Sequence, residues 1–241
     1  EDLQGKKILI GANGATSLLD AISDILDAGV VITSDPFYYI FTDTLERKGF
    51  QVLAIPEDEE GLSVTELRNE LERMDTDSIR MFYIVTVNNP SSSILSNRRR
   101  EEIARLVTAL SRKQKRKIPL IMDKAYEDII HGEDIEEPVS GLKHDELGNI
   151  FEVGTLSKVI APALRIGYLI GNDPEFCQGI MQRTSDIGFS APLINQEIAG
   201  WLLDYRIDQQ RETVNRAYRR KAQWIRQALR QELAGFLESL S

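Results

Sequence analysis

Short apolar runs alternate with amphipathic stretches through most of this sequence, and that alternation limits the chain to few architectures. Apolar runs of strand length predict strands at 7–10, 30–34, 51–55, 80–86, 119–123, 150–155 and 165–171. Between them lie helical patterns, such as the three- and four-residue spacing of Ile103, Leu106, Val107 and Leu110. Strands that alternate with helices favour the α/β class, so we expect a mainly parallel sheet of about seven strands sandwiched by helices.

The rest of the pattern fits one large domain over residues 1–241. After residue 171 only helical patterns follow, and a charged segment predicts a long helix near 208–236. The polar, turn-rich stretch 132–149 is predicted to be a surface excursion between two strands. The basic run 112–117 is predicted to be a solvated helix end, where cations complement the helix dipole.

Composition argues against several classes of function. The net charge of −9 disfavours a nucleic-acid surface, which needs a concentrated basic face. No apolar run of about 18 residues is present to span a bilayer, and the first residues lack a signal peptide's apolar core. We therefore expect a cytoplasmic protein with no membrane partner. Cys177 is the only cysteine, and His131 and His144 are the only histidines, which disfavours disulfides, metal sites and a Ser/His/Asp triad.

Polar residues follow several predicted strands, and parallel sheets bind ligands at the carboxyl ends of their strands. After the first strand, Gly11 and Gly14 flank Asn13 just before a helix. Backbone amides of Gly14, Ala15 and Thr16 would face an anion there, although a simple tight turn explains the same glycines.

Two further strand ends offer flat or polar groups. Pro36 fixes a turn that would present Phe37, Tyr38 or Tyr39 for stacking on a flat ligand, with core aromatics as the alternative. A later Asn-Pro turn places the amide of Asn89 at the same edge, but such turns are common.

Charged groups follow the next two strands. Asp123 either caps the following segment or holds a cationic ring nitrogen, and Tyr126 lies three residues on. Apolar neighbours would disfavour the ammonium form of Lys158 and make its amine available for Schiff-base chemistry. A lysine that extends to solvent is the alternative.

Arg165, with the hydroxyls of Thr155 and Ser157, suits a phosphate because a guanidinium matches phosphate oxygens. The predicted groups suit the parts of one small molecule. They are an anion site for a phosphate, a stacking aromatic, a donor and a phenol for a ring hydroxyl, an acid for a pyridine nitrogen and a lysine for an aldehyde. They are the partners of pyridoxal 5′-phosphate (PLP), which the sequence therefore predicts as the cofactor.

Three motifs carry a family resemblance: NPSS at 89–92, DKAY at 123–126 and TLSKVIAPALRIG at 155–167. In order and kind they resemble motifs of the class I/II aminotransferases of fold type I. The likeness is to the branch that holds 2-aminoadipate aminotransferases and the aminotransferase-like domains of GntR-type regulators. Ser92 and Ala163 stand where that branch usually has glycine, and Thr155 replaces the usual serine.

The resemblance implies a role for each matching residue. Lys158 would form the Schiff base and then move the proton at the substrate α-carbon, while Asp123 would keep the pyridine nitrogen protonated. Asn89 and Tyr126 would bind the ring hydroxyl, and Tyr38 would stack on the ring. The phosphate ligands would be Gly14, Ala15, Thr16, Thr155, Ser157 and Arg165.

We therefore expect the cofactor-binding large domain of an aminotransferase that moves an amino group between an L-amino acid and a 2-oxo acid. Alternatives are a C–S lyase, a decarboxylase, an aminocyclopropane-carboxylate-synthase-like enzyme, a PLP-binding sensor domain of a transcription regulator, or a scaffold without chemistry. The resemblance also implies a homodimer. The family's N-terminal segment and C-terminal small domain, with its carboxylate-binding arginine, have no counterpart here, so we expect inefficient turnover by these residues alone.

Overall fold

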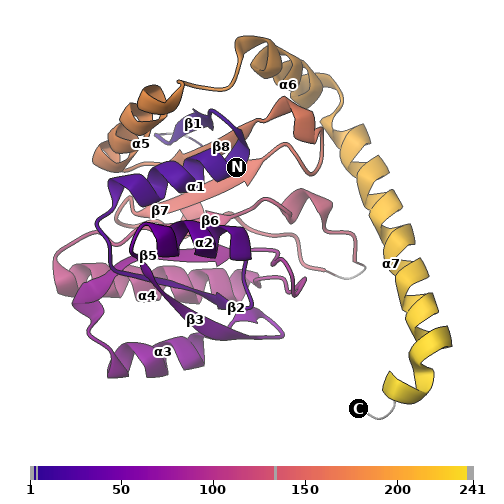
Figure 1. The fold of residues 1–241 in the computed structure, drawn as a ribbon, viewed down its shortest axis with the longest axis horizontal. Helices are drawn as coiled ribbons and strands as arrows, with labels where there is room; N and C mark the ends of the chain where they lie inside the picture. The colour runs from indigo at the N-terminus through magenta and orange to yellow at the C-terminus, as the bar shows by residue number, and fades with distance from the viewer. Residues whose placement is uncertain (1–2, 4, 133–134, 238–241) are drawn as a thin grey trace.

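The computed structural model describes residues 3, 5–132 and 135–237, with side chains described as far as residue 233. An eight-stranded mixed sheet forms its centre (Figure 1). The strands are β1 (Lys7–Gly11), β2 (Val30–Asp35), β3 (Gln51–Asp58), β4 (Gly61–Leu62), β5 (Ile79–Val85), β6 (Leu120–Asp123), β7 (Ile150–Thr155) and β8 (Gly167–Gly171).

The sheet is largely parallel, as expected. In the order β1-β8-β7-β6-β5-β2-β3-β4, the strands from β7 to β3 run parallel. Strand β8 is antiparallel to both neighbours, and β4 is antiparallel to β3. The α/β prediction is confirmed, and every expected strand is present. The pattern does not predict β4, because two residues carry no periodicity.

Helices cover both faces of the sheet. One face packs on α1 (Gly14–Ile25), α2 (Tyr39–Arg47) and α5 (Pro174–Ile187), and the other on α3 (Val64–Arg73) and α4 (Asn97–Gln114). The alternation of β5 shows why. Met81 and Tyr83 pack with α1 and α2, whereas Phe82 and Ile84 pack with α3 and α4, because successive strand residues point to opposite faces.

Two further helices, α6 (Leu193–Tyr205) and α7 (Ile207–Leu237), complete the described chain. Figure 1 shows α7, in yellow, along one side of the molecule. Helix α7 covers the region expected near 208–236, with a break at Leu233, where φ is −123° and ψ is 17°. Trp201, Trp224 and Ile225 are exposed on these helices. Across residues 3, 5–132 and 135–237, no helix combines the length and apolar character needed to cross a bilayer.

Short 3-10 helices shape the connections: η1 (Thr76–Ser78), η2 (Glu127–Ile129), η3 (Gly141–His144) and η4 (Pro162–Leu164). The basic run 112–117 is a solvated helix end, as predicted, because α4 stops at Gln114 and the cations around it are exposed.

The expected surface excursion at 132–149 is wrong in part. Ser140 and Gly141 are buried, and Leu142 packs in the core with Ile150. Ser140 Oγ donates to Glu152 Oε1 at 2.9 Å, so two polar side chains satisfy each other inside the fold. A polar composition therefore does not reveal this burial. Residues 133–134 lie outside the described residues.

One glycine sets the approach of α1 to the sheet. A Cβ atom on Gly167, at the start of β8, would lie 2.2 Å from the carbonyl carbon of Gly14 and 2.3 Å from the amide nitrogen of Ala15. The Gly14 N–H donates to the Arg165 carbonyl at 2.8 Å. Because backbone occupies the space that a side chain would need, the helix reaches this position only beside glycine.

We expect Gly167→Ala to lower the free energy of unfolding by about 1–3 kcal/mol, the usual effect of overpacking a site that cannot yield. Gly200→Ala is the matched control, because a Cβ at Gly200 in α6 meets nothing within 4 Å. The control should be neutral or more stable by up to about 1 kcal/mol, from helix propensity. Urea denaturation of both variants measures this, and equal effects would contradict the packing argument.

Candidate active site

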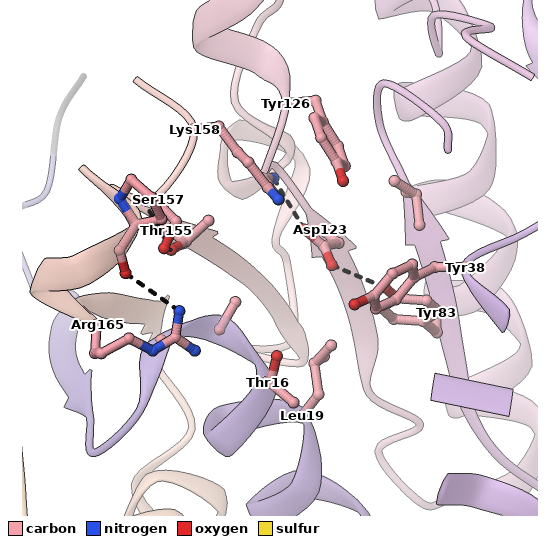
Figure 2. A pocket seen from close by; sticks show the side chains of 15 residues that line it. Thr16, Leu19, Tyr38, Tyr83, Asp123, Tyr126, Thr155, Ser157, Lys158 and Arg165 are labelled. Carbon is pink, nitrogen blue, oxygen red and sulfur yellow. Dashed lines mark hydrogen bonds between the residues drawn. The ribbon is translucent and has the colours of Figure 1, made fainter. Parts of the chain in front are cut away.

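A cavity of about 250 Å³ opens at the carboxyl ends of β5, β6 and β7. Its lining residues are Gly14, Ala15, Thr16, Leu19, Tyr38, Tyr83, Val85, Asp123, Ala125, Tyr126, Thr155, Ser157, Lys158, Pro162 and Arg165. Figure 2 shows Arg165 and Thr16 toward one end, Asp123 and Tyr38 toward the other, and Lys158 between them. Every residue predicted from the sequence therefore lies on this cavity except Asn89, which contacts Tyr126.

The N-terminus of α1 provides one end of the cavity, but the Gly14 amide is not available to a ligand. It donates to the Arg165 carbonyl, which corrects the expectation that it faces an anion. The amides of Ala15 and Thr16 belong to the first helical turn, where N–H groups have no intrahelical partner, and Asn13 makes no side-chain cap. These two amides remain to bind an anion.

Arg165 is held against that helix end. Its Nε donates to Asn13 Oδ1 at 2.6 Å, its Nη2 to the Asn13 carbonyl at 3.2 Å, and its Nη1 to the Pro162 carbonyl at 3.3 Å. A fixed cation beside the positive end of a helix dipole is unfavourable by itself. An anion bound between them removes that conflict.

The turn after β7 uses the Thr155 hydroxyl for its own shape. Thr155 Oγ1 lies 2.9 Å from both Ser157 Oγ and the Ile166 carbonyl oxygen, and it accepts a 3.2 Å bond from the Ser157 amide. Thr155 is buried, whereas Ser157 is half-buried. The hydroxyl of Ser157 is thus better placed than that of Thr155 to meet a ligand.

Lys158 follows in the same turn and is exposed. The expectation that apolar neighbours desolvate it is therefore wrong for this structure. Its Nζ lies 5.2 Å from the centroid of the Tyr126 ring. Among the described residues it makes no hydrogen bond or ion pair, so its amine is uncommitted within the cavity.

Asp123 supplies a buried acid at the end of β6. Tyr83 Oη donates to Asp123 Oδ2 at 2.7 Å, and the Ala125 amide donates to Oδ1 at 2.9 Å. Burial raises the pKa of Asp123, while these two bonds and the charge of Lys158 oppose the rise. Burial also raises the pKa of Tyr83 well above its usual value, so this phenol remains a donor.

Sequence reasoning missed Tyr83. It stands in an apolar strand and shares a sheet face with Met81 and Val85. A phenol near the end of such a strand, on the same face as two core residues, is the signal that could have identified it.

Two more aromatic residues border the acid. Asn89 Nδ2 donates to Tyr126 Oη at 3.1 Å, which fixes the phenol beside Lys158. Tyr38 is half-buried, and its pKa is raised by burial and by the nearby Tyr126 and Asp123. All three residues come from loops that follow strands, as the motif positions predict.

Asn88, which the sequence analysis did not single out, ties these loops together. It is 4% exposed, and its Nδ2 donates to the Pro36 carbonyl and to Glu57 Oε1, both at 2.6 Å. The Ser92 amide donates to the Asn88 carbonyl at 2.9 Å with a left-handed φ of 64° at Ser92. The family's usual glycine at position 92 fits this backbone better than serine.

The site residues suit an organic cofactor better than a metal. Within the described parts of the chain, no three His, Cys, Asp or Glu side chains gather closely enough to hold a metal ion. The donors instead form an anion site at one end and a carboxyl group at the other, with a primary amine between. These groups fit the phosphate, the ring nitrogen and the aldehyde of PLP.

A comparison with known families agrees with this chemistry. The family described as Aminotransferase class I and II matches residues 3–238. The chain belongs to this family.

Relatives within the aminotransferase family are named both as enzymes and as regulators. The 2-aminoadipate transaminase of Thermus thermophilus is 26% identical over 95% of this chain and 56% of its own length. The uncharacterized HTH-type transcriptional regulator YisV of Bacillus subtilis is 28% identical over 83% of this chain and 40% of its own length. The chain thus spans about half the length of the curated relatives it matches.

Solved aminotransferases share the fold. LysN, an alpha-aminoadipate aminotransferase from Thermus thermophilus complexed with N-(5′-phosphopyridoxyl)-L-leucine, has a TM-score of 0.81 at 26% identity and covers 94% of this chain and 56% of its own. An archaeal alanine:glyoxylate aminotransferase has a TM-score of 0.80 at 27% identity, covering 94% of this chain and 55% of its own. The architecture is that of an aminotransferase large domain.

The raised pKa of Asp123 predicts a pH-dependent cost of its burial. Stability linked to this carboxyl is fully present below its unfolded pKa of 3.8 and is lost as pH rises through the higher folded value. We expect Asp123→Asn to become more stable relative to the unsubstituted, ligand-free protein as pH rises above about 4. Urea denaturation across pH measures the difference.

Asp173→Asn is the control of opposite sign. Burial raises the pKa of Asp173, but Lys117, at 2.6 Å, and the Phe176 amide outweigh it, so the folded value is lowered. Its contribution is present above pH 3.8 and lost as pH falls through the lower folded value. The same trend in both variants would contradict the assignment.

Proposed function

We propose that this chain is the PLP-binding large domain of an aminotransferase that moves an amino group between an L-amino acid and a 2-oxo acid. The observation that carries the proposal is one cavity with an anion site at one end, a buried acid at the other and an uncommitted lysine between them. Family membership and the likeness to LysN support it. When bound, the cofactor supplies an electron-withdrawing ring that stabilises negative charge at the α-carbon.

Residues at the two ends of the cavity bind and orient. The amides of Ala15 and Thr16, the Ser157 hydroxyl and the Arg165 guanidinium would hold the phosphate. Asp123 would pair with the ring nitrogen and keep it protonated, because a cationic ring nitrogen offsets the cost of the buried carboxylate. Asn89 and Tyr126 would hydrogen-bond the ring hydroxyl, and Tyr38 would stack on the ring.

Lys158 acts at the centre. Its amine would hold the cofactor through the aldehyde carbon, with loss of water, and when released it would accept and return the proton at the α-carbon of the substrate. Tyr126 lies against Lys158 and would hold the lysine amine on one side of the cofactor ring.

We further propose a homodimer, as the resemblance implies. The exposed side chains of Phe189, Leu193, Ile194 and Trp201 support it, because large apolar side chains are costly to leave in water.

A second candidate function is a PLP-binding sensor domain, and the match to HTH-type regulators supports it. An enzyme loaded with PLP and given an amino acid and a 2-oxo acid turns over many times. A sensor keeps the cofactor and releases no product, whereas a lyase or decarboxylase releases thiol, ammonia or carbon dioxide.

We expect added PLP to give the purified protein a visible absorption band, and borohydride reduction to fix the label on Lys158. Lys158→Arg should abolish the labelling, because guanidinium is not a nucleophile at neutral pH. Lys115→Arg is the control, an exposed lysine at the end of α4. Peptide mass mapping reads the result, and a label on another lysine would refute the role of Lys158.

The anion site predicts a separate loss of affinity. Arg165→Gln should raise the dissociation constant for PLP roughly 10- to 100-fold, since a charged hydrogen bond is worth about 1.5–3 kcal/mol. Arg105→Gln is the control, because Arg105 forms an exposed pair with Glu101 on α4. Spectroscopic titration measures both constants, and equal constants would exclude Arg165 from the phosphate site.

A further inference from the structure

Alternating charges are buried behind the loop that carries Asp123 and Tyr126. Arg100 Nη1 lies 2.6 Å from Glu127 Oε1, and Glu127 Oε2 lies 3.3 Å from Lys124 Nζ. Lys124 Nζ in turn lies 3.1 Å from Glu152 Oε2. The side chains of Arg100 and Glu152 are 1% and 0% exposed, and those of Glu127 and Lys124 are 10% and 14% exposed. We call these four residues the buried charge chain.

Both ends of the buried charge chain are anchored to the fold. Arg100, on α4, donates to the Leu95 carbonyl at 3.2 Å. Glu152, on β7, accepts bonds from Ser140 Oγ at 2.9 Å and from the Gly141 amide at 2.8 Å. The two middle members, Lys124 and Glu127, enclose Ala125 and Tyr126 in the sequence, so the segment is held between a helix and a strand.

Stability alone does not account for this arrangement. Removing four charges from water is costly, and apolar residues of similar volume often stabilise a protein equally well or better. Alternating charges differ from an apolar cluster in one respect, because each buried charge keeps its ion pair only when its neighbours keep their places. This dependence is strict for Arg100, whose Nη2 has no hydrogen-bond partner among the described residues. None of the four residues lines the cavity. Their effect on a ligand must pass through the segment they hold.

We propose that Arg100, Glu127, Lys124 and Glu152 are positioning residues that fix the 123–127 segment, so that Asp123 and Tyr126 face the cofactor. The Ala125 amide that bonds Asp123 and the Tyr126 ring beside Lys158 both belong to this segment. The inference rests on the proposed function for the identity of the ligand, but its claim about the segment does not.

Glu127→Gln tests the proposal, because it removes the charge while keeping the shape. We expect amides at 124–129 to exchange hydrogen faster in the ligand-free protein, and the dissociation constant for PLP to rise about ten-fold. Glu152→Gln is a second variant that keeps an acceptor for Ser140 and Gly141, and it should act in the same direction.

Asp145→Asn is the matched control. Asp145 has a side chain that is 0% exposed and pairs with Lys6 at 3.1 Å, but it does not line the cavity. It should lower global stability without faster exchange at 124–129 and without loss of PLP affinity.

The two readouts separate the two proposals. Faster exchange at 124–129 in the glutamine variants but not in the control supports the positioning role, and unchanged exchange there overturns it. If exchange is faster but the PLP affinity is unchanged, the buried charge chain has only a structural role, and its proposed link to the cofactor is overturned. If the unsubstituted full chain gives no PLP absorption band, the proposed function fails, while the exchange result still decides the claim about the segment.

Discussion

The close contact between Gly167 and the first turn of α1 determines where the anion end of the cavity lies. Because β8 is antiparallel to β7, the chain turns back through 155–166 before passing under the helix N-terminus. Arg165 then makes two kinds of hydrogen bond to the N-terminus of α1. Its carbonyl accepts from the Gly14 amide, and its guanidinium donates to Asn13, the residue before the helix. A helix start and a cation are thus brought together by backbone packing, and their shared positive character makes an anion the natural third member.

The opposite end has the complementary electrostatic problem. Asp123 is buried, and its pKa is raised because the carboxylate has left water for an apolar environment. A ligand that is negative at one end and positive at the other relieves both conflicts at once. This arrangement of charges favours a zwitterionic aromatic phosphate over a simple phosphate. Binding of such a ligand would also stabilise the fold, because it would offset the electrostatic cost at each end of the cavity.

Local patterns in the sequence predict the sheet well but its contacts less well. Apolar runs identify the strands from β1 to β8 other than the two-residue β4, and motif order places Asp123, Tyr126 and Lys158 at strand ends. The use of the Gly14 amide by Arg165 is not predictable, because it depends on two segments that meet only in the folded chain. The same holds for Tyr83, Asn88 and Glu152, because the Tyr83 hydroxyl, the Asn88 Nδ2 and the Glu152 carboxylate bond to partners distant in sequence, while their neighbours in sequence are apolar or turn-forming.

In the proposed site, the residues that bind the cofactor differ from the residue that would move the substrate proton. In the proposed function, Arg165 and Asp123 bind PLP, and this role is the same whether the protein catalyses a reaction or reports on a ligand. That is consistent with matches over most of the chain to proteins named as transaminases and to proteins named as regulators. Transamination adds one demand, which is that the amine of Lys158 be free to move a proton repeatedly. An exposed lysine with no ion pair among the described residues meets that demand, and for this reason we place the enzyme ahead of the sensor.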